Sequence, residues 1–262
     1  MSKGDPGIPR ETDRDNDGDT LPFITLVPNM VTTLGLCAGL TAIRFIMAGQ
    51  FLSAVWLILF ATVADGLDGL IARRLNATSD LGAQLDSLSD FINFGVTPGF
   101  LVYQMALAPG ERSDGWIFVL VYIVCCCMRL ARFNVAQNRA ATNGDTAPAA
   151  RHFTGVPAPA GALMALLPVF ISFETGIALK DHTALVEIYI VLVGLLMVSR
   201  LPTFSPKSIR VPRERIAWVL IGLALVIGIM LAEIWRALIA FILIYCATLL
   251  HSFVMFLRGR RR

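Results

Sequence analysis

Long apolar runs, separated by short polar breaks, make up most of the chain after a polar N-terminal segment. A run of about 20 residues is the length that a helix needs to cross the hydrocarbon core of a bilayer. The pattern predicts eight membrane-spanning helices, at approximately 24–48, 52–74, 82–108, 116–138, 157–178, 184–200, 215–231 and 235–257. We therefore expect an all-α integral membrane protein, built as a bundle of about eight transmembrane helices.

The same pattern predicts a main body with extensions at both ends. We expect a flexible polar tail at 1–22, a main helical bundle at 23–200, a cytoplasmic loop at 201–214, a C-terminal transmembrane hairpin at 215–257 and a basic tail at 258–262. The N-terminal tail has no apolar core of the kind that signal peptides contain, so we expect it to be solvated.

The composition agrees with a membrane protein and excludes other classes. Hydrophobic residues make up 56% of the chain, charged residues only 16%, and the mean hydropathy is +0.68. Soluble domains carry about 25% charged residues, so an ordinary water-soluble enzyme is excluded, as is a disordered chain. Outside the tail at 258–262 there is no basic patch with interleaved aromatic residues, and we expect no nucleic-acid partner.

Lysine and arginine residues are distributed unevenly over the predicted loops. About 16 of them lie in loops on the side of the N-terminus, against 3 on the opposite side, namely Arg112, Lys180 and Arg236. Because positively charged loops stay in the cytoplasm, we expect both termini to be cytoplasmic. An even number of spans agrees with that orientation.

Four aspartates interrupt the second and third predicted spans, where a charge needs compensation. Each costs about 2.5–3.5 kcal/mol at mid-bilayer, so the four together cost on the order of 10 kcal/mol. Asp65 and Asp68 are three residues apart and share a helix face, as do Asp86 and Asp90, which are four apart. A short connection at about 75–81 makes the two helices antiparallel neighbours. We therefore expect the four carboxylates to converge near the cytoplasmic surface.

Divalent cations are the compensation that we expect for these carboxylates. Mg²⁺ and Mn²⁺ prefer oxygen ligands, and four carboxylates are enough for two ions about 4 Å apart, an arrangement that supports phosphoryl displacement. Salt bridges to Arg73, Arg74, Arg129 or Arg132 are an alternative, but they explain one or two aspartates rather than four. A transporter pathway is a second alternative, although transporters commonly spread such groups along a path, whereas these lie close together.

Small residues lie beside the aspartates within the second predicted span, at Gly66, Gly69 and Ala72. Glycine in a helix interior costs about 1 kcal/mol relative to alanine. A groove without side chains lets a flat ligand approach the backbone, and close helix packing is the alternative explanation. Next to four aspartates we favour the ligand groove.

The aspartates belong to a longer pattern that resembles the signature of the CDP-alcohol phosphotransferase family at every fixed position. It reads Asp65-x-x-Asp68-Gly69-x-x-Ala72-Arg73, then Gly82-x-x-x-Asp86-x-x-x-Asp90. The resemblance implies a helical bundle with a polar pocket that faces the cytoplasm, where a hydroxyl nucleophile displaces CMP. The implied metal ligands are Asp65, Asp68, Asp86 and Asp90, with Asp90 also the general base. The implied CDP site is lined by Asp65, Gly69, Ala72, Arg73 and Gly82.

Further segments are similar to the phosphatidylserine synthase branch of that family. They are Pro28-Asn29-x-x-Thr32, Asp86-Ser87-Leu88-Ser89-Asp90 and Arg129-Leu130-Ala131-Arg132-Phe133-Asn134. The resemblance adds Asn29 and Thr32 to the CDP site. We also expect serine or a lipid phosphate to be bound by Arg129, Arg132 and Asn134, because a planar guanidinium can bind a carboxylate bidentately. Alternatives are arginines that only snorkel to headgroups and an Asn29 that caps a helix after Pro28.

This branch of the family implies a complete reaction. The hydroxyl of L-serine attacks the phosphatidyl phosphorus of CDP-diacylglycerol and releases phosphatidylserine and CMP. The implied partners are these two substrates and membrane lipids, with a homodimer by analogy, and the implied location is the inner membrane of a bacterium. Glycerol 3-phosphate, inositol phosphate and choline are alternative acceptors, and a divalent-cation transporter is the alternative from another class of protein.

Overall fold

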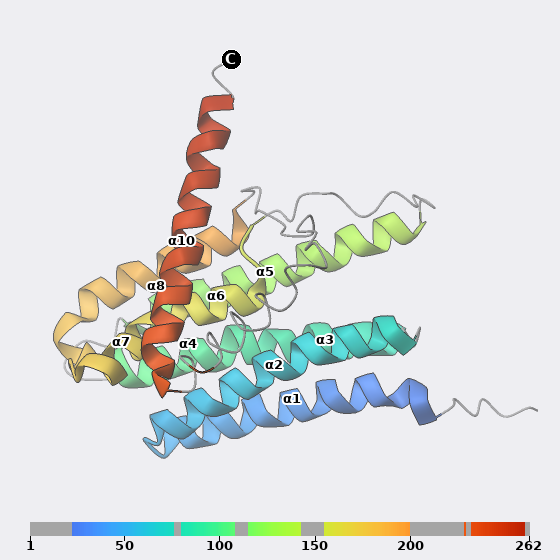
Figure 1. Ribbon diagram of the computed structural model, residues 1–262, viewed down its shortest axis with the longest axis horizontal. Coiled ribbons are helices and arrows are strands. Elements are labelled where there is room, and N and C mark those ends of the chain that lie inside the picture. The colour runs from blue at the N-terminus through green and yellow to red at the C-terminus, as the bar shows by residue number, and fades with distance from the viewer. Residues whose placement is uncertain are drawn as a thin grey trace, which may run out of the picture.

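The computed structural model describes residues 23–75, 80–107, 115–142, 155–199 and 232–259, together with Gly228. Within these ranges the regular structure is helical and contains no β-strand (Figure 1). Six segments are long and apolar enough to cross a membrane: Val27–Met47, Phe51–Ile71, Gly115–Ala136, Ala158–Thr175, Leu179–Val198 and Ile234–Phe253. These observations fit the predicted all-helical integral membrane protein.

The helices are labelled in chain order in Figure 1. The first half of the described chain contains α1 (Phe23–Met47), α2 (Phe51–Leu75), α3 (Asp80–Asp90), η1 (Phe91–Val96), α4 (Thr97–Val102) and η2 (Tyr103–Leu107). The second half contains α5 (Gly115–Thr142), α6 (Ala158–Ala165), α7 (Leu167–Thr175), η3 (Leu179–His182), α8 (Thr183–Val198) and α10 (Ile234–Gly259). The segments η1 and η2 are π-helical, and η3 is a 3-10 helix.

Two of the eight predicted spans are not among these six apolar segments. The run predicted at 82–108 is helical, but two π-helical stretches divide it into α3, η1, α4 and η2. The run predicted at 215–231 lies outside the described residues, apart from Gly228. The number of eight spans therefore stays a prediction, as does the C-terminal hairpin.

A tight turn folds α2 back along α1 (Figure 1). Gly49 has φ +71°, a left-handed conformation that glycine adopts without steric cost. Its N–H donates to the carbonyl of Ile46 at 3.0 Å, and the N–H of Gln50 donates to the carbonyl of Phe45 at 2.9 Å. These are the two bonds of a Schellman helix end. Because the turn is short, α1 and α2 are neighbours in the bundle.

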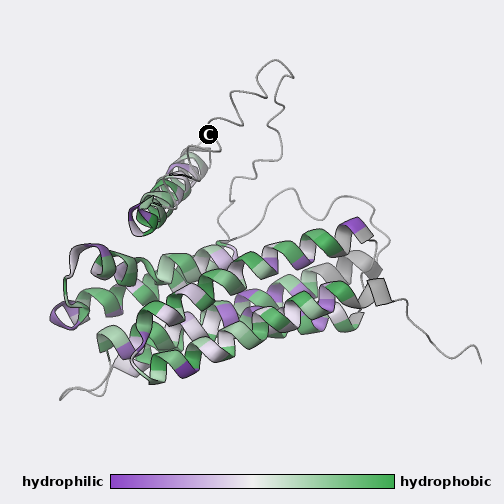
Figure 2. Ribbon diagram, turned by 60° about the horizontal axis from the view of Figure 1, so that its bottom comes forward, coloured by the Kyte–Doolittle hydropathy of each residue, from purple (hydrophilic) through white to green (hydrophobic). Residues whose placement is uncertain are grey.

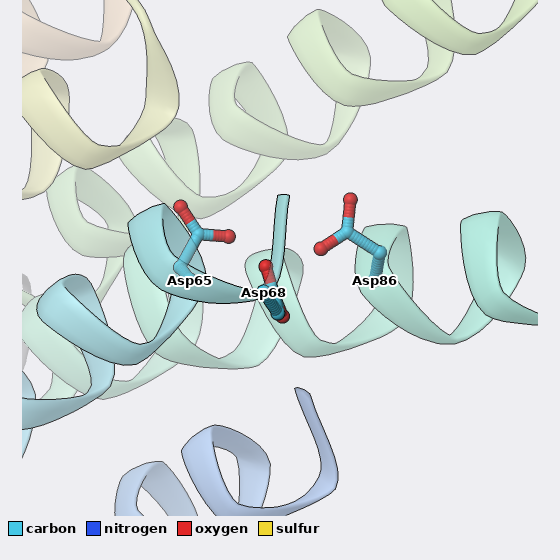
Figure 3. A group of neighbouring side chains, drawn as sticks. All are labelled: Asp65, Asp68 and Asp86. Carbon is cyan, nitrogen blue, oxygen red and sulfur yellow. The ribbon is translucent and has the colours of Figure 1, made fainter. Parts of the chain in front are cut away.

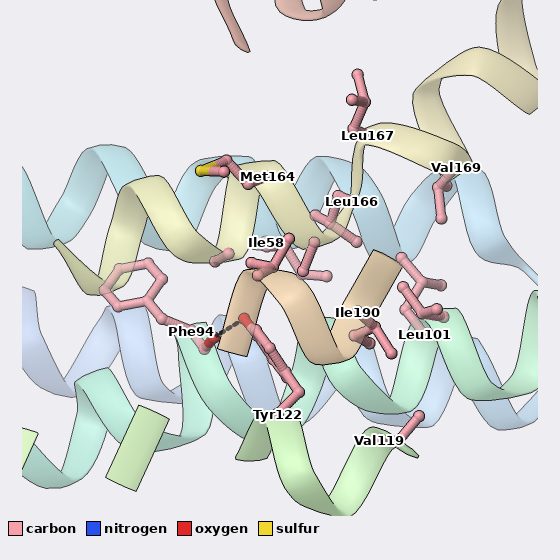
Figure 4. Packing of buried hydrophobic residues seen from close by; sticks show 14 of the residues in the cluster. Ile58, Phe94, Leu101, Val119, Tyr122, Met164, Leu166, Leu167, Val169 and Ile190 are labelled. Carbon is pink, nitrogen blue, oxygen red and sulfur yellow. Dashed lines mark hydrogen bonds between the residues drawn. The ribbon is translucent and has the colours of Figure 1, made fainter. Parts of the chain in front are cut away.

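A hydrophobic core fixes the run from α3 to η2 against α5 (Figure 4). Tyr122 on α5 is fully buried, and its hydroxyl donates to the carbonyl of Phe94 in η1 at 2.6 Å. Gly99 on α4 allows a close approach, because a Cβ there would lie 3.2 Å from Cγ1 of Ile123 and 3.3 Å from Cγ1 of Val119. Because α3 leads directly into η1, the packing of η1 and α4 against α5 also sets the orientation of α3.

Large apolar side chains cover much of the outer surface of the helices. Leu81 is 75% exposed, Leu185 70% and Ile188 69%. Figure 2 shows that hydrophobic residues dominate the described helices. Exposed apolar surface on this scale is uncommon in water-soluble monomers, whereas in a bilayer it meets lipid chains. The surface therefore agrees with the membrane location that the composition indicates.

The first turn of α10 is fixed to the bundle by aromatic and ionic contacts. The ring of Trp235 lies 5.1 Å from that of Phe173 and 6.0 Å from that of Trp56, measured between centroids. Arg236 donates from Nε to Oε1 of Glu174 at 2.5 Å. These contacts hold the beginning of α10 against α7 and α2.

Candidate functional site

Three of the four predicted aspartates lie together between α2 and α3. Asp65 and Asp68 come from α2 and Asp86 from α3, and one carboxylate oxygen of each lies within 4.8 Å of the others. In Figure 3 the carboxylates of Asp65 and Asp86 point toward each other, with Asp68 between them. We call these residues the three-aspartate cluster. Its donor set is three hard carboxylate oxygens, which suits Mg²⁺ or Mn²⁺.

Helix geometry explains why residues 18 or more positions apart meet here. Asp65 and Asp68 share a face of α2 because they are separated by about one turn. α1 packs against both α2 and α3, which run in opposite directions (Figure 1). The shared neighbour holds the two acidic faces opposite each other, as the spacing and the short connection predict.

Asp90 lies one turn beyond Asp86, at the end of α3. It is not part of the three-aspartate cluster, but it is close enough to Asp65 for the two carboxyl groups to interact electrostatically. Arg129 of α5 is also within electrostatic range of Asp90. Asp90 is therefore adjacent to the cluster, on the side where α5 passes.

The salt-bridge alternative is not seen among the described side chains. Their ion pairs join Arg236 to Glu174 and Glu233, far along the sequence from the cluster. The side chain of Arg73 lies outside the described residues, although its backbone belongs to the last turn of α2. Among the described side chains no arginine forms an ion pair with the cluster, and its three carboxylate oxygens are a donor set that could hold a divalent cation.

Thr32 contacts the cluster directly. Its Oγ1 donates to Oδ2 of Asp68 at 2.5 Å, and both side chains are buried. The assignment of Thr32 to the CDP site stays a prediction, and the structure places its hydroxyl against a carboxylate of the cluster. Spacing within one helix could not reveal this contact, because Thr32 and Asp68 belong to different helices.

The expectation that Asn29 caps a helix after Pro28 is wrong. Both residues lie inside α1, which begins at Phe23 and continues through the proline. Pro28 is the sixth residue of α1, so it lacks the N–H that would bond to the carbonyl of Ile24 in a regular helix. Asn29 is half-buried, and its carbonyl accepts a hydrogen bond from Thr33 at 2.7 Å.

The two arginines of the α5 segment are both anchored to backbone carbonyls. Arg129 donates from Nε to the carbonyl of Val156 at 2.7 Å. Arg132 donates from Nη1 to the carbonyl of Val198 at 2.8 Å and is exposed. Arg129 therefore joins α5 to Val156, shortly before α6, whereas Arg132 joins α5 to the end of α8.

Asn134 is bonded to α3. Its Nδ2 lies 3.0 Å from Oγ of Ser87, which follows Asp86 in the sequence. The same hydroxyl is 3.0 Å from the carbonyl of Ala83. Asn134 therefore joins α5 to the helix that carries Asp86, at the level of the three-aspartate cluster.

The small residues of the motif lie on both sides of the cluster. Gly69 is half-buried on α2, and Gly82 is half-buried on α3. A Cβ at Gly66 would meet no described atom within 4 Å, so close helix packing does not explain this glycine. The side chain of Ala72 lies outside the described residues.

Sequence reasoning gave no role to two buried polar side chains near the cluster. Ser89 is 4% exposed and Asn93 2%, and they are hydrogen bonded to each other at 3.1 Å. The available signal was their spacing: Ser89, Asn93 and Thr97 follow one another at intervals of four within an apolar run. Such a stripe indicates a buried polar face.

The fold and the site together define a class of protein, a membrane helical bundle with an acidic site that could hold a divalent cation. The sequence from residue 25 to residue 199 matches the family model described as CDP-alcohol phosphatidyltransferase. The chain belongs to this family, as the aspartate motif predicts. It is therefore a membrane transferase of phospholipid biosynthesis.

Curated relatives share one printed name, CDP-diacylglycerol–serine O-phosphatidyltransferase. The protein of Mycobacterium bovis is 37% identical over 204 residues, which cover 77% of this chain and 69% of that protein. The protein of Helicobacter pylori is 32% identical over 201 residues, covering 77% and 81%. The protein of Methanocaldococcus jannaschii is 33% identical over 176 residues, covering 67% and 72%.

Proposed function

We propose that this chain transfers the phosphatidyl group of CDP-diacylglycerol to the hydroxyl of L-serine and releases phosphatidylserine and CMP. The observation that carries the proposal is the three-aspartate cluster, which brings together motif residues from two helices of a chain in this family. The shared name of the relatives favours serine as the acceptor.

The carboxylates fit two divalent cations, Mg²⁺ or Mn²⁺. Asp65, Asp68 and Asp86 would hold them, with Asp90 as a further ligand at the side of Asp65. Bound there, the cations would neutralise the diphosphate and the charge that develops on it. The CDP site would be lined by Asn29, Thr32, Asp65, Gly69, Ala72, Arg73 and Gly82, and the open space at Gly66 supports the approach of a flat ligand.

Asp90 would act as the general base. A carboxylate one turn from a metal ligand is in position to accept the proton of the serine hydroxyl while the oxygen attacks phosphorus. The bond from phosphorus to CMP then breaks, and Arg73 would bind the phosphate of CMP. The diacylglycerol chains would stay in the bilayer, so the site would have to open sideways between helices.

Arg129 would select serine among hydroxyl acceptors. Its anchored Nε and its position near Asp90 support a role for the terminal nitrogens in binding the serine carboxylate. Arg132 and Asn134 would hold α5 in place or bind the lipid phosphate. Phosphorylated acceptors such as glycerol 3-phosphate, which lack that carboxylate, would gain less from Arg129.

Replacing Arg129 by lysine is expected to lower kcat/KM for serine about tenfold or more, mainly through KM, because lysine cannot bind a carboxylate bidentately. The KM for CDP-diacylglycerol should change little. Initial rates over a serine series would measure this, with Arg74→Lys as the matched control near the same end of the bundle. An unchanged serine KM in Arg129→Lys would contradict the assignment.

The topology is part of the proposal. We propose eight spans, both termini in the cytoplasm and a polar pocket open to that side, in a bacterial inner membrane. The excess of positive residues in loops on the N-terminal side supports the orientation. The divisions 1–22, 23–200 as the catalytic bundle, 201–214, 215–257 and 258–262 are proposed with it, and so is a homodimer.

Reconstitution tests the function directly. Purified protein with CDP-diacylglycerol, Mn²⁺ and labelled serine should form labelled phosphatidylserine and equimolar CMP. A panel containing glycerol 3-phosphate, inositol phosphate and choline should give much lower rates. If no acceptor releases CMP, the enzyme proposal fails, and uptake of Mn²⁺ into vesicles without CMP formation would favour a transporter.

A further inference from the structure

The buried polar side chains of the described residues occupy one neighbourhood. They are Thr32, Asp68, Ser89, Asn93 and Thr97, all with exposed fractions of 7% or less. They come from α1, from α2 and from the run between α3 and α4, and they meet along the inner side of α1. Burying polar groups costs free energy unless they are hydrogen bonded. Their concentration beside one carboxylate of the three-aspartate cluster therefore needs an explanation.

A chain of hydrogen bonds leads from that carboxylate into the core. Thr32 donates from Oγ1 to Oδ2 of Asp68 at 2.5 Å. Ser89 donates from Oγ to the main-chain carbonyl of Thr32 at 3.5 Å, and Asn93 donates from Nδ2 to Oγ of Ser89 at 3.1 Å. This series of hydrogen bonds connects α2, α1, α3 and η1, and the bond between Thr32 and Asp68 is the shortest of the three.

The end of this series of hydrogen bonds that lies deepest in the core has two unusual features. Oδ1 of Asn93 is buried and has no hydrogen-bond partner among the described residues. It lies against Gly39, where a Cβ would overlap it, so only glycine admits Asn93 at this point of α1. The N–H of Thr97 donates to the carbonyl of Ile92, the spacing of a π-helix, a form that is rare and frequent at functional sites.

We infer that Thr32, Ser89 and Asn93 are positioning residues for Asp68. The hydroxyl of Thr32 fixes Oδ2, so that the carboxylate keeps one orientation and its second oxygen is available to a cation. Ser89 and Asn93 hold the backbone of Thr32 and thereby the register of α1 against α3. Ser89 and Asn93 need not touch a substrate, and the effect of Thr32 on Asp68 is separate from its proposed place in the CDP site. The inference rests on the proposed function, because it gives a purpose to the orientation of one proposed metal ligand.

Metal binding by the full-length protein in nanodiscs tests this without any turnover. Titration with Mn²⁺, followed by electron paramagnetic resonance in the absence of both substrates, should show about a tenfold higher Kd for Thr32→Val, because a hydrogen bond to a charged group is lost. Thr32→Ser keeps the hydroxyl and should stay within about twofold. Ser89→Ala and Asn93→Ala should raise Kd by only about threefold, since they act through a long bond to the backbone.

Thr33→Val is the matched control. Thr33 is the next residue of α1, is exposed, and donates from its hydroxyl to the carbonyl of Asn29 at 2.7 Å. Its Mn²⁺ affinity should equal that of the wild type. In turnover assays at saturating Mn²⁺, Thr32→Val should lower kcat with little change in the KM for serine, which distinguishes positioning from acceptor binding.

Thermal unfolding of the metal-free protein separates positioning from stability. A Thr32→Val protein that unfolds at a lower temperature but binds Mn²⁺ like the wild type would make the role structural and overturn the inference. Equal losses in Thr32→Ser and Thr32→Val would overturn it too, because the hydroxyl would not be the active group. A wild-type protein that binds no Mn²⁺ would overturn the proposed metal site itself, a failure that the wild-type titration alone reveals.

Discussion

Substitution of Asp90 by asparagine is expected to lower kcat by about 10²–10⁴-fold, the usual contribution of a general base. Asparagine has nearly the same shape but cannot accept the proton of the serine hydroxyl. The variant loses one proposed metal ligand, but because the three-aspartate cluster is unchanged it should keep much of its affinity for a CDP-containing ligand. Single-turnover formation of CMP, together with calorimetric titration of CDP, would measure both effects.

Asp181→Asn is a suitable control for this experiment. Asp181 is an exposed carboxylate in η3, and it lies in the connection between α7 and α8. Its substitution should leave kcat unchanged. If Asp90→Asn is as active as Asp181→Asn, Asp90 is not the base, and another group must accept the proton.

Substitution of Asp65 or Asp68 by asparagine is expected to weaken metal binding and turnover together. Loss of a partner of a metal ligand already costs about 10–100-fold in affinity, so loss of a ligand should cost at least about 100-fold. Nucleotide affinity measured in the presence of Mn²⁺ should fall in parallel, because cations held by the cluster would neutralise the charge of the diphosphate. Mn²⁺ titration and CDP titration on the same samples would test this.

The two sets of variants differ in a way that separates the roles. Asp90→Asn should lose rate while it keeps most of its binding, whereas Asp68→Asn should lose binding and rate together. A higher Mn²⁺ concentration should partly restore Asp68→Asn but not Asp90→Asn. Asp68→Asn with normal Mn²⁺ and CDP affinity would show that the cluster does not hold the metal, whatever the substrate of the enzyme.

Much of the fold could be predicted from the hydrophobic pattern of individual segments. Five of the runs predicted as spans, among them 24–48 and 116–138, coincide closely with apolar helices, and 157–178 is interrupted only near Leu166. Bilayer thickness imposes a length and an apolar composition on each span, and both are properties of a single segment. The run at 82–108 was predicted as one span, but its two π-helical stretches have no comparable sequence signal.

The site could be predicted only where it depends on residues that lie close together in the sequence. Asp65 and Asp68 share a face by helix geometry alone, and Asp86 follows on a helix joined by a short connection, so the cluster was predictable. The contact of Thr32 with Asp68 was not, and neither was the bond between Asn134 and Ser87. These pairs are 36 and 47 residues apart in the sequence.

The sequence by itself determined the membrane class, the family and the aspartates that a bilayer least tolerates. Only the tertiary structure decided which polar side chains those aspartates meet, that Asn29 lies within a helix, and that Arg129 and Arg132 are anchored to different segments. The physical reason is that helix periodicity fixes which residues share a face. The rotation and register of one helix against another depend on packing over many residues, such as Tyr122 against Phe94 and Asn93 against Gly39.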